Sequence, residues 1–360
     1  MWNASAPYSA YAPYFPSPLP AVDHPWYHTE RAELVPGLSD KNLSLLAPVF
    51  VYWAFSLFFH YLDRLGWDAL ERYRIHEPEE VKSKNRVTVR EVIVAVVLQH
   101  VVQTAAGWWF MPDDDAFVDH AADLNWWGGR IATAVLAVAG EKSGAPFMAR
   151  YGVLATRMWY WYAIPVARLA WAMLVMDGWQ YMMHRSAHQV TFLYRTIHSW
   201  HHRLYVPYAF GALYNHPIEG FVLDTLGTGI AHELSGLSIR QATLFFVAST
   251  MKTVDDHCGF AFPWDPLQHL FGNNADYHDI HHQVAGLKKN YSQPWFISWD
   301  IFFGTRMTRQ EFATKVAKRF HPEETGEPVE VPKNEVNGPN ELAAPPTSRI
   351  AGPALKEKVN

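Results

Sequence analysis

The sequence predicts an all-α fold, an integral membrane bundle of about four to six membrane helices. Three observations lead to this prediction. First, 49% of the 360 residues are hydrophobic and 18% are charged, whereas soluble domains carry about 25% charged residues. Second, aromatic residues make up 15% of the chain, and Trp and Tyr favour the interface between membrane and water. Third, several apolar segments reach or approach the roughly 20 residues that cross a bilayer.

The first half of the chain contains two predicted spans. Residues 1–42 are rich in Pro and Tyr and lack the basic start of a cleavable signal peptide. The apolar segment 43–62 is the first expected span, and 92–110 is the second. Seven Lys or Arg residues lie between them, from Arg64 to Arg90, and short basic loops stay in the cytosol. We therefore expect residues 111–130 on the lumenal side.

The second half is expected to return to the cytosolic side. Segment 131–140 is too short to cross a membrane alone and is assigned to the interface, whereas 158–182 is a third predicted span. Residues 205–255 alternate apolar runs with polar turns, which predicts either a re-entrant hairpin or a pair of spans. We expect one membrane domain over 43–306 and a disordered, polar C-terminal tail over 307–360.

Histidine is the outlier in the composition, with 19 copies. The motif HxxxH occurs once next to the third predicted span, and the motif HxxHH occurs twice. At these spacings the rings share one face of a helix. Two of the histidines that lie between the second and third motifs, His216 and His257, are also candidates. The ten candidate metal ligands are His184, His188, His198, His201, His202, His216, His257, His278, His281 and His282.

Clusters of this size favour metal binding over packing, because a buried imidazole is costly unless it is paired. Neutral imidazole binds Zn, Cu, Fe and Ni. Ten ligands exceed what one reactive metal accepts, so the pattern predicts two ions in a cytosolic, histidine-rich cap. We predict no catalytic residue beyond these ligands and no bound organic cofactor. The other histidines, including His60, His100 and His269, are assigned to structure or surface.

Acidic residues near the motifs could hold the second nitrogen of each imidazole. An ordinary solvated carboxylate is the other interpretation of each. The candidates are Asp177, Asp255, Asp256, Asp276 and Asp279. The single cysteine, Cys258, excludes an internal disulfide, and the formal net charge of −5 does not suggest nucleic acid as a partner.

The segments HRSAH, HSWHH and HDIHH resemble the three histidine boxes of the fatty acid hydroxylase / sterol desaturase superfamily of membrane di-iron enzymes. The resemblance covers roughly residues 45–306. More narrowly, YRIHEPEEVKSKNRVTVREVIVAVVLQHVVQT, TVDDHCGF and NYSQPWFISWDIFFGT are similar to the fungal sphinganine 4-hydroxylases. The boxes place eight of the candidates in this pattern, whereas His216 and His257 match less strongly marked family positions.

The resemblance implies a monooxygenase that hydroxylates carbon 4 of sphinganine or dihydroceramide to give phytosphingosine-type bases. It implies two Fe ions, O2 as co-substrate, and electrons from NADPH or NADH through a cytochrome b5-type donor. The haem motif HPGG of a fused cytochrome b5 is absent, so we expect a separate cytochrome b5 and its reductase. The implied location is the endoplasmic reticulum membrane, multi-pass, with the histidine boxes facing the cytosol.

Other functions stay open at this stage. A sterol desaturase or sterol methyl oxidase would share the three boxes. A membrane zinc-dependent hydrolase or a metal-binding membrane protein without activity belongs to a different class, although a zinc hydrolase needs far fewer histidines. The sequence does not choose between a free sphingoid base and a ceramide as the substrate.

Overall fold

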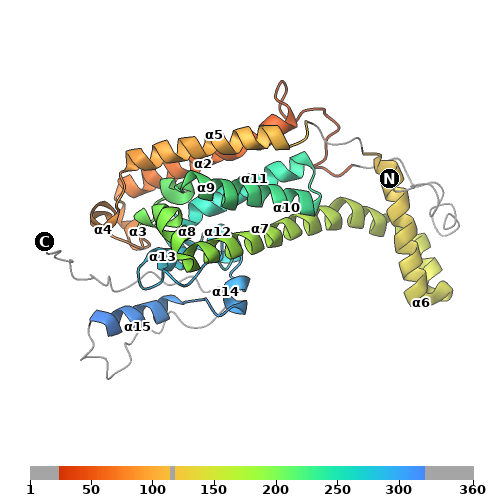
Figure 1. Ribbon diagram of the computed structural model, residues 1–360. Helices are drawn as coiled ribbons and strands as arrows, with labels where there is room; N and C mark the ends of the chain where they lie inside the picture. The colour runs from red at the N-terminus through yellow and green to blue at the C-terminus, as the bar shows by residue number, and fades with distance from the viewer. Residues whose placement is uncertain (1–23, 114–117, 321–360) are drawn as a thin grey trace. The chain divides into compact units, whose positions relative to one another are not determined.

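The computed structural model describes residues 24–113 and 118–320, and these residues form helices and loops without a β-strand (Figure 1). The all-α prediction is therefore confirmed for the described part. The chain divides into two compact units. One contains the residues up to Leu45 together with Phe110–Ala172 and Ala231–Phe245. The other contains Leu46–Trp109, Met173–Ile230 and the residues from Phe246 onward.

Two helices match the first two predicted spans. Helix α2, Asp40–Leu65, contains segment 43–62, and helix α5, Val89–Phe110, contains segment 92–110. Among the described helices, these two are long and apolar enough to cross a membrane. They lie side by side, because the rings of Tyr52 on α2 and His100 on α5 are 4.9 Å apart. His100 thus has the structural role that the sequence assigned to it.

Segment 131–140 is part of a longer helical element. This segment does not stand alone but belongs to α6, His120–Met158. Gly140 interrupts α6 with φ 69° and ψ 168°, a conformation that is essentially restricted to glycine. The two arms meet at the buried Ala132 and Met148, so α6 is a helical hairpin with Gly140 at its turn.

The remaining apolar stretches are also helical. Segment 158–182 runs through a short π-helix, Trp159–Ala163, into α7, Ile164–Gln189. Residues 205–255 contain a helical hairpin that turns at Gly236, where φ is 58°. Its elements are η4 Ala209–Leu213, α9 Pro217–Gly220, η5 Phe221–Leu226, α10 Gly227–Ser235 and α11 Ile239–Asp256.

Short helices complete the fold around the histidine motifs. They are α3 Asp68–Glu71, α4 Pro78–Lys84, α8 Thr191–Thr196, η3 His198–Arg203, α12 Pro266–Leu270, α13 Ala275–His282, α14 Ser298–Phe302 and α15 Arg309–Phe320. One apolar core contains side chains of α2, α5 and η4 and of the segments that follow η3 and α11. Tyr52 donates a hydrogen bond of 2.6 Å to the carbonyl oxygen of Phe210, which fixes η4 against α2.

Helix α15 corrects the expectation of a disordered tail over 307–360. Its first residue, Arg309, donates hydrogen bonds to Asp276 (2.8 Å) and Asp279 (2.9 Å), both on α13. The folded part therefore continues past residue 306, and these ion pairs tie α15 to a helix that carries three histidines. The rest of the predicted tail, 321–360, lies outside the described residues, as do residues 1–23.

Candidate metal centre

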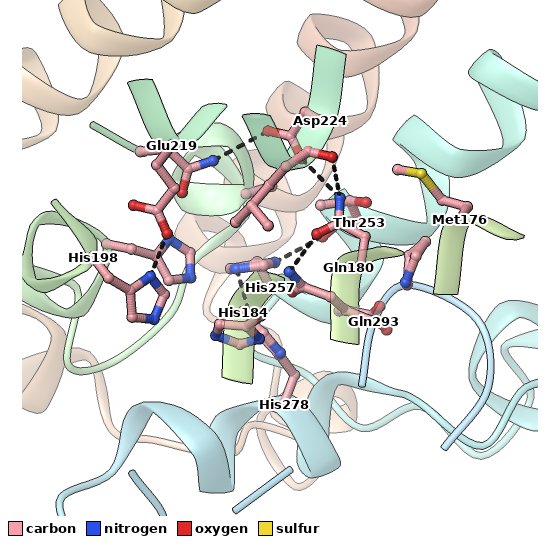
Figure 2. Close-up of a pocket in the computed structure, with 16 residues that line it drawn as sticks. Met176, Gln180, His184, His198, Glu219, Asp224, Thr253, His257, His278 and Gln293 are labelled. Carbon is pink, nitrogen blue, oxygen red and sulfur yellow. Dashed lines mark hydrogen bonds and ion pairs between the residues drawn. The ribbon is translucent and has the colours of Figure 1, made fainter. Parts of the chain in front are cut away.

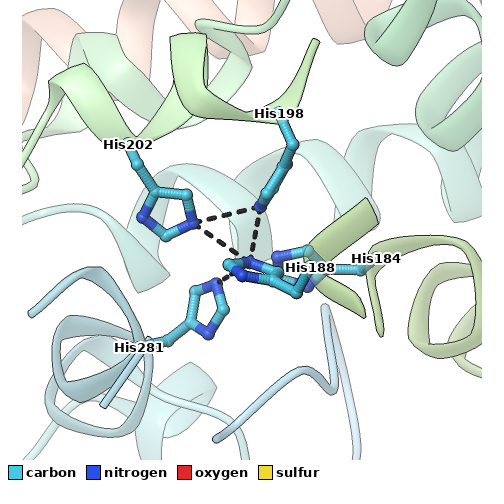
Figure 3. Close-up of side chains that lie close together, drawn as sticks. All are labelled: His184, His188, His198, His202 and His281. Carbon is cyan, nitrogen blue, oxygen red and sulfur yellow. Dashed lines mark hydrogen bonds between the residues drawn. The ribbon is translucent and has the colours of Figure 1, made fainter. Parts of the chain in front are cut away.

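Five histidines from three separate segments form the first group (Figure 3). Each offers one ring nitrogen, and these nitrogens all lie within 4.8 Å of one another. The Nε2 atoms of His188 and His198 are 2.7 Å apart, and those of His188 and His281 are 3.1 Å apart. The first group consists of His184, His188, His198, His202 and His281.

Four further histidines form the second group, again with ring nitrogens within 4.8 Å of one another. The Nε2 atom of His278 lies 3.1 Å from that of His257 and 3.1 Å from that of His282. The second group consists of His201, His257, His278 and His282. Nine of the ten candidate ligands are thus brought together in two groups.

In each HxxHH motif, one histidine belongs to a different group from the other two. In η3 the first and last histidines, His198 and His202, belong to the first group, while His201 belongs to the second. In α13 the outer pair belongs to the second group, while His281 belongs to the first. Each HxxHH motif therefore contributes histidines to both groups. The two groups adjoin, because the ring centroid of His201 lies 5.8 Å from that of His198 and 5.7 Å from that of His202.

Backbone carbonyl groups fix the rings of five of these histidines. A carbonyl oxygen only accepts hydrogen bonds, so the ring nitrogen that contacts it must carry the proton. The Nδ1 atoms pair as follows: His184 with Tyr291 (2.9 Å), His201 with Tyr214 (3.1 Å), His257 with Thr253 (2.8 Å), His281 with Lys289 (2.7 Å) and His282 with Leu204 (2.8 Å).

This pairing determines what the groups can bind. A neutral imidazole protonated at Nδ1 presents only a lone pair at Nε2. The Nε2 lone pairs therefore converge, and that of His184 has no hydrogen-bond partner although it is buried. Burial lowers the pKa of His198 and of His257 to about 3 and that of His201 to about 4, so these rings are neutral near pH 7. Converging neutral donors suit transition-metal ions.

Glu219 contacts one of the grouped histidines, and the sequence analysis did not identify it. It lies in α9, is buried, and contacts Nδ1 of His198 through Oε1, as Figure 2 shows. Its Oε2 has no hydrogen-bond partner. A carboxylate on the second nitrogen of a ligating imidazole fixes the ring and raises its basicity. The signal in the sequence was an acidic residue between apolar runs, three positions after His216.

The five aspartates proposed from the sequence have other partners. In the described residues, none of them accepts a hydrogen bond from a histidine of the two groups. Asp177 accepts the backbone N–H groups of Trp295 (3.0 Å) and Phe296 (2.7 Å), while Asp279 pairs with His76 and Arg309. Asp256 pairs with the buried Lys252. These carboxylates hold the loops around the histidines and are not solvated surface groups.

His216 is the one candidate outside both groups. It is the residue immediately before α9, and its Nδ1 accepts the backbone N–H of Ile218 at 3.3 Å. Its ring packs against Trp200, with the ring centroids 4.8 Å apart. This histidine therefore caps the helix that carries Glu219.

A cavity of about 40 Å³ opens onto both histidine groups (Figure 2). His184 and His198 of the first group line it, as do three histidines of the second group. The opposite wall is polar and includes Gln180, Asn215 and Asp224. The centre therefore combines two metal-sized nitrogen cages with an adjoining space for a small polar group.

Comparison with known proteins identifies relatives of this chain. The family model for fatty acid hydroxylases matches residues 169–305. The sphingolipid C4-hydroxylase of Saccharomyces cerevisiae is 43% identical over 289 residues, which cover 80% of this chain and 78% of that protein. The corresponding enzyme of Schizosaccharomyces pombe is 41% identical, covering 76% and 91%. Sphinganine C4-monooxygenase 1 of Arabidopsis thaliana is 40% identical, covering 75% and 90%.

Sterol-modifying relatives are more distant. Methylsterol monooxygenase 1 of Rattus norvegicus is 32% identical over 163 residues, which cover 45% of this chain and 54% of that protein. No solved structure matches this chain. The similarity therefore favours the C4-hydroxylases over the sterol oxidases.

Proposed function

The chain belongs to the fatty acid hydroxylase family, and from this premise we propose that it is a membrane monooxygenase that hydroxylates carbon 4 of a sphingoid base or its ceramide. The family is one of di-iron enzymes. The observation that carries the proposal is the convergence of nine histidine side chains in two groups next to one polar cavity. The product would be a phytosphingosine-type base.

The nine grouped histidines would hold the two iron ions, and His216 would not be a ligand. The first group would contribute five nitrogens and the second group four. Their donor chemistry fits, because imidazole suits iron as well as zinc and copper. When bound, the irons would supply the reduction of O2 that makes an unactivated C–H bond attackable. One oxygen atom would enter the lipid and the other would leave as water.

The protein's own contribution is to hold the histidine rings and to position the lipid. Carbonyl groups of Tyr291, Tyr214 and Leu204 fix ring nitrogens, so the nitrogens that face the ions are positioned before any ion binds. Burial keeps bulk water away from the groups. Neighbouring methylene groups of a lipid are chemically almost alike, so selection of carbon 4 must come from position.

The electron donor and the location are also part of the proposal. Electrons would come from NADPH or NADH through a separate cytochrome b5 and its reductase. The chain would lie in the endoplasmic reticulum membrane, with the histidine groups on the cytosolic side. The basic segment between α2 and α5 supports this orientation.

Expression in a fungus that cannot make phytosphingosine tests the proposal. We expect phytosphingosine to reappear in the long-chain bases, and the variant His281→Ala at the same protein level should not restore it. Feeding sterol precursors to the same cells should give no new sterol product. Phytosphingosine formation that does not depend on O2 and a reductant would contradict the assignment as a monooxygenase.

A further inference from the structure

We propose that a tryptophan-lined groove at the start of α7 binds one phospholipid, with the lipid phosphate on Arg168 and an acyl chain against the tryptophan rings. The groove is separate from the metal centre, because none of the described residues that line it is a histidine or lines the polar cavity. The inference goes beyond the proposed function and does not depend on it.

The groove is formed by one face of η2 and α7 together with the first arm of α6. Ala163, Ala167 and Trp171 recur at a spacing of four residues, so they lie on the same side of the helical segment. The two alanines contribute only methyl groups, which leaves space between the larger rings. The volume of the groove is about 360 Å³, within the range of about 300–1,000 Å³ that is usual for ligand sites.

The aromatic lining favours a hydrocarbon chain. The rings of Trp127 and Trp159 are 5.7 Å apart and form the wall that faces α7. Trp159 and Trp171 remain 44% and 53% exposed. Tryptophan prefers the membrane interface, where its ring can contact acyl chains while its polar edge stays wet. An acyl chain in the groove would cover apolar surface that this part of the fold leaves open.

The charge of the lining favours an anion. Arg168 is the one ionisable side chain among the described residues that line the groove, and it is exposed. Within residues 24–113 and 118–320 it makes no hydrogen bond and no ion pair. The hydroxyl group of Ser235 does not compensate for this charge, because it already donates to the carbonyl oxygen of Ala231 at 2.6 Å. The groove therefore presents one unneutralised cation on an apolar wall.

The position of Arg168 makes a bound anion more favourable. Arg168 lies inside the predicted span 158–182, where a charged side chain is costly unless it meets an opposite charge or reaches the interface. Helical side chains tilt toward the N-terminus of their helix, and for α7 the N-terminus is the end expected on the lumenal side. The guanidinium group is thereby directed toward the lipid head groups.

A phospholipid satisfies both features of the groove in one molecule. A guanidinium group can donate two parallel hydrogen bonds to a phosphate. The acyl chain of the same molecule would contact the rings of Trp159 and Trp171. A lipid without phosphate would leave Arg168 without a counter-charge, and a phosphate without acyl chains would leave the rings uncovered.

Native mass spectrometry of the full-length protein, delipidated in detergent, tests the inference. The protein is titrated with phosphatidic acid and with a diacylglycerol that has the same acyl chains and differs only by the missing phosphate. We expect one phosphatidic acid per chain, bound at least fivefold more tightly than the diacylglycerol. Arg168→Gln should lower the affinity for phosphatidic acid to that for the diacylglycerol, whereas Arg168→Lys should retain part of the preference. Trp171→Ala should weaken the binding of both lipids.

The variant Arg150→Gln is the matched control, because it removes an arginine that stacks on Tyr151 outside the groove lining. Equal affinities of the wild type for the two lipids, or a full preference for phosphatidic acid in Arg168→Gln, would overturn the inference. Displacement of the lipid by an equal concentration of glycerol 3-phosphate would also contradict it, since the acyl chain would then add nothing. A lipid-free dimer would mean that a second copy of the chain covers the groove. If Arg168→Gln does not fold, the wild-type comparison and Arg168→Lys decide.

Discussion

At the scale of single residues, neighbours in the sequence serve different metal groups. His201 and His202 are adjacent in η3, but the first belongs to the group with His257 and the second to the group with His188. The spatial partner of His201 is thus a residue far away in the sequence. Double variants can distinguish grouping by position in the sequence from grouping by position in space.

We expect His201→Ala/His257→Ala to empty only the second group and to leave about one iron per chain. The pair His201→Ala/His202→Ala removes one ligand from each group, so neither group keeps its full ligand set, and after a wash with a chelator this variant should retain less iron than the first one. Iron content of purified protein by elemental analysis checks this. The same iron content in both double variants would contradict the assignment of these histidines to two groups.

Glu219 should control the affinity of the first group through His198. Loss of a carboxylate behind a ligating imidazole typically lowers metal affinity about 10–100-fold. We expect this loss for Glu219→Ala and a smaller loss for Glu219→Gln, whose amide oxygen can still accept from Nδ1. Competition with a chelator gives the affinity without any turnover. Equal affinities in Glu219→Ala and the surface control Glu79→Gln would rule the role out.

His216 should affect stability and not metal binding. Its side chain caps the first turn of α9, and loss of a cap costs about 1 kcal/mol. We therefore expect His216→Ala to lower the free energy of unfolding by about that amount with unchanged iron content, whereas His216→Asn retains a capping side chain. A loss of iron in both variants would restore His216 to the ligand set.

The sequence predicted the histidines better than their surroundings. Spacing alone places His184 and His188 on one helical face, and the structure confirms that both belong to one group. The partners of the other ring nitrogens could not be predicted, because carbonyls such as Tyr291 and Leu204 come from loops whose path depends on the whole fold. Glu219 was missed for the same reason.

At the scale of elements, α13 is clamped by charged groups from both sides. His76 Nε2 lies 2.7 Å from Asp279 on α13, and His76 Nδ1 lies 2.7 Å from Glu80 on α4. On the other side, Arg309 of α15 pairs with Asp276 and Asp279. These contacts hold the helix that carries histidines for both groups.

This clamp predicts a pH dependence of stability. Burial alone would lower the pKa of His76, but Asp279 and Glu80 outweigh it and raise the pKa from 6.5 to about 9. A raised histidine pKa means that the stabilisation is complete below pH 6.5 and is lost as the pH rises through about 9. The contribution is at most about 3 kcal/mol.

Thermal unfolding of detergent-solubilised protein measures the contribution of His76 to stability. Wild-type protein should be more stable than His76→Gln at pH 6.5, and the difference should shrink as the pH is raised through 9. A difference that stays constant over this range would show that His76 does not stabilise α13 through its charge.

The two membrane spans could be predicted from the sequence, whereas α15 and the hairpin of α6 could not. Segments 43–62 and 92–110 were predicted because a single property, apolar length, decides a membrane span. Helix α15 was missed because its stability comes from Arg309 bound to α13, and no local pattern in a polar segment reveals that contact. The hairpin of α6 was missed because its turn depends on the backbone conformation of Gly140.

At the scale of the whole molecule, the two candidate spans lead to a prediction of the topology. Helix α5 has 22 residues, which at about 1.5 Å each span the roughly 30 Å of a hydrocarbon core. Lys41 near the start of α2 lies 2.7 Å from Asp113, just after the end of α5. The start of α2 and the end of α5 therefore lie together, as two antiparallel spans require.

Cysteine labelling of sealed microsomes with an impermeant maleimide tests this topology. Lys82 lies in α4, before the start of α5, and Asp113 lies just after the end of α5. Their side chains are 72% and 92% exposed. We expect Lys82→Cys to be labelled in intact vesicles and Asp113→Cys to be labelled only after detergent is added, because the basic segment before α5 stays in the cytosol. The native Cys258 is buried and gives little background. The opposite labelling would place the lumenal and cytosolic ends the other way round, and labelling of both cysteines in intact vesicles would mean that α5 does not cross the membrane.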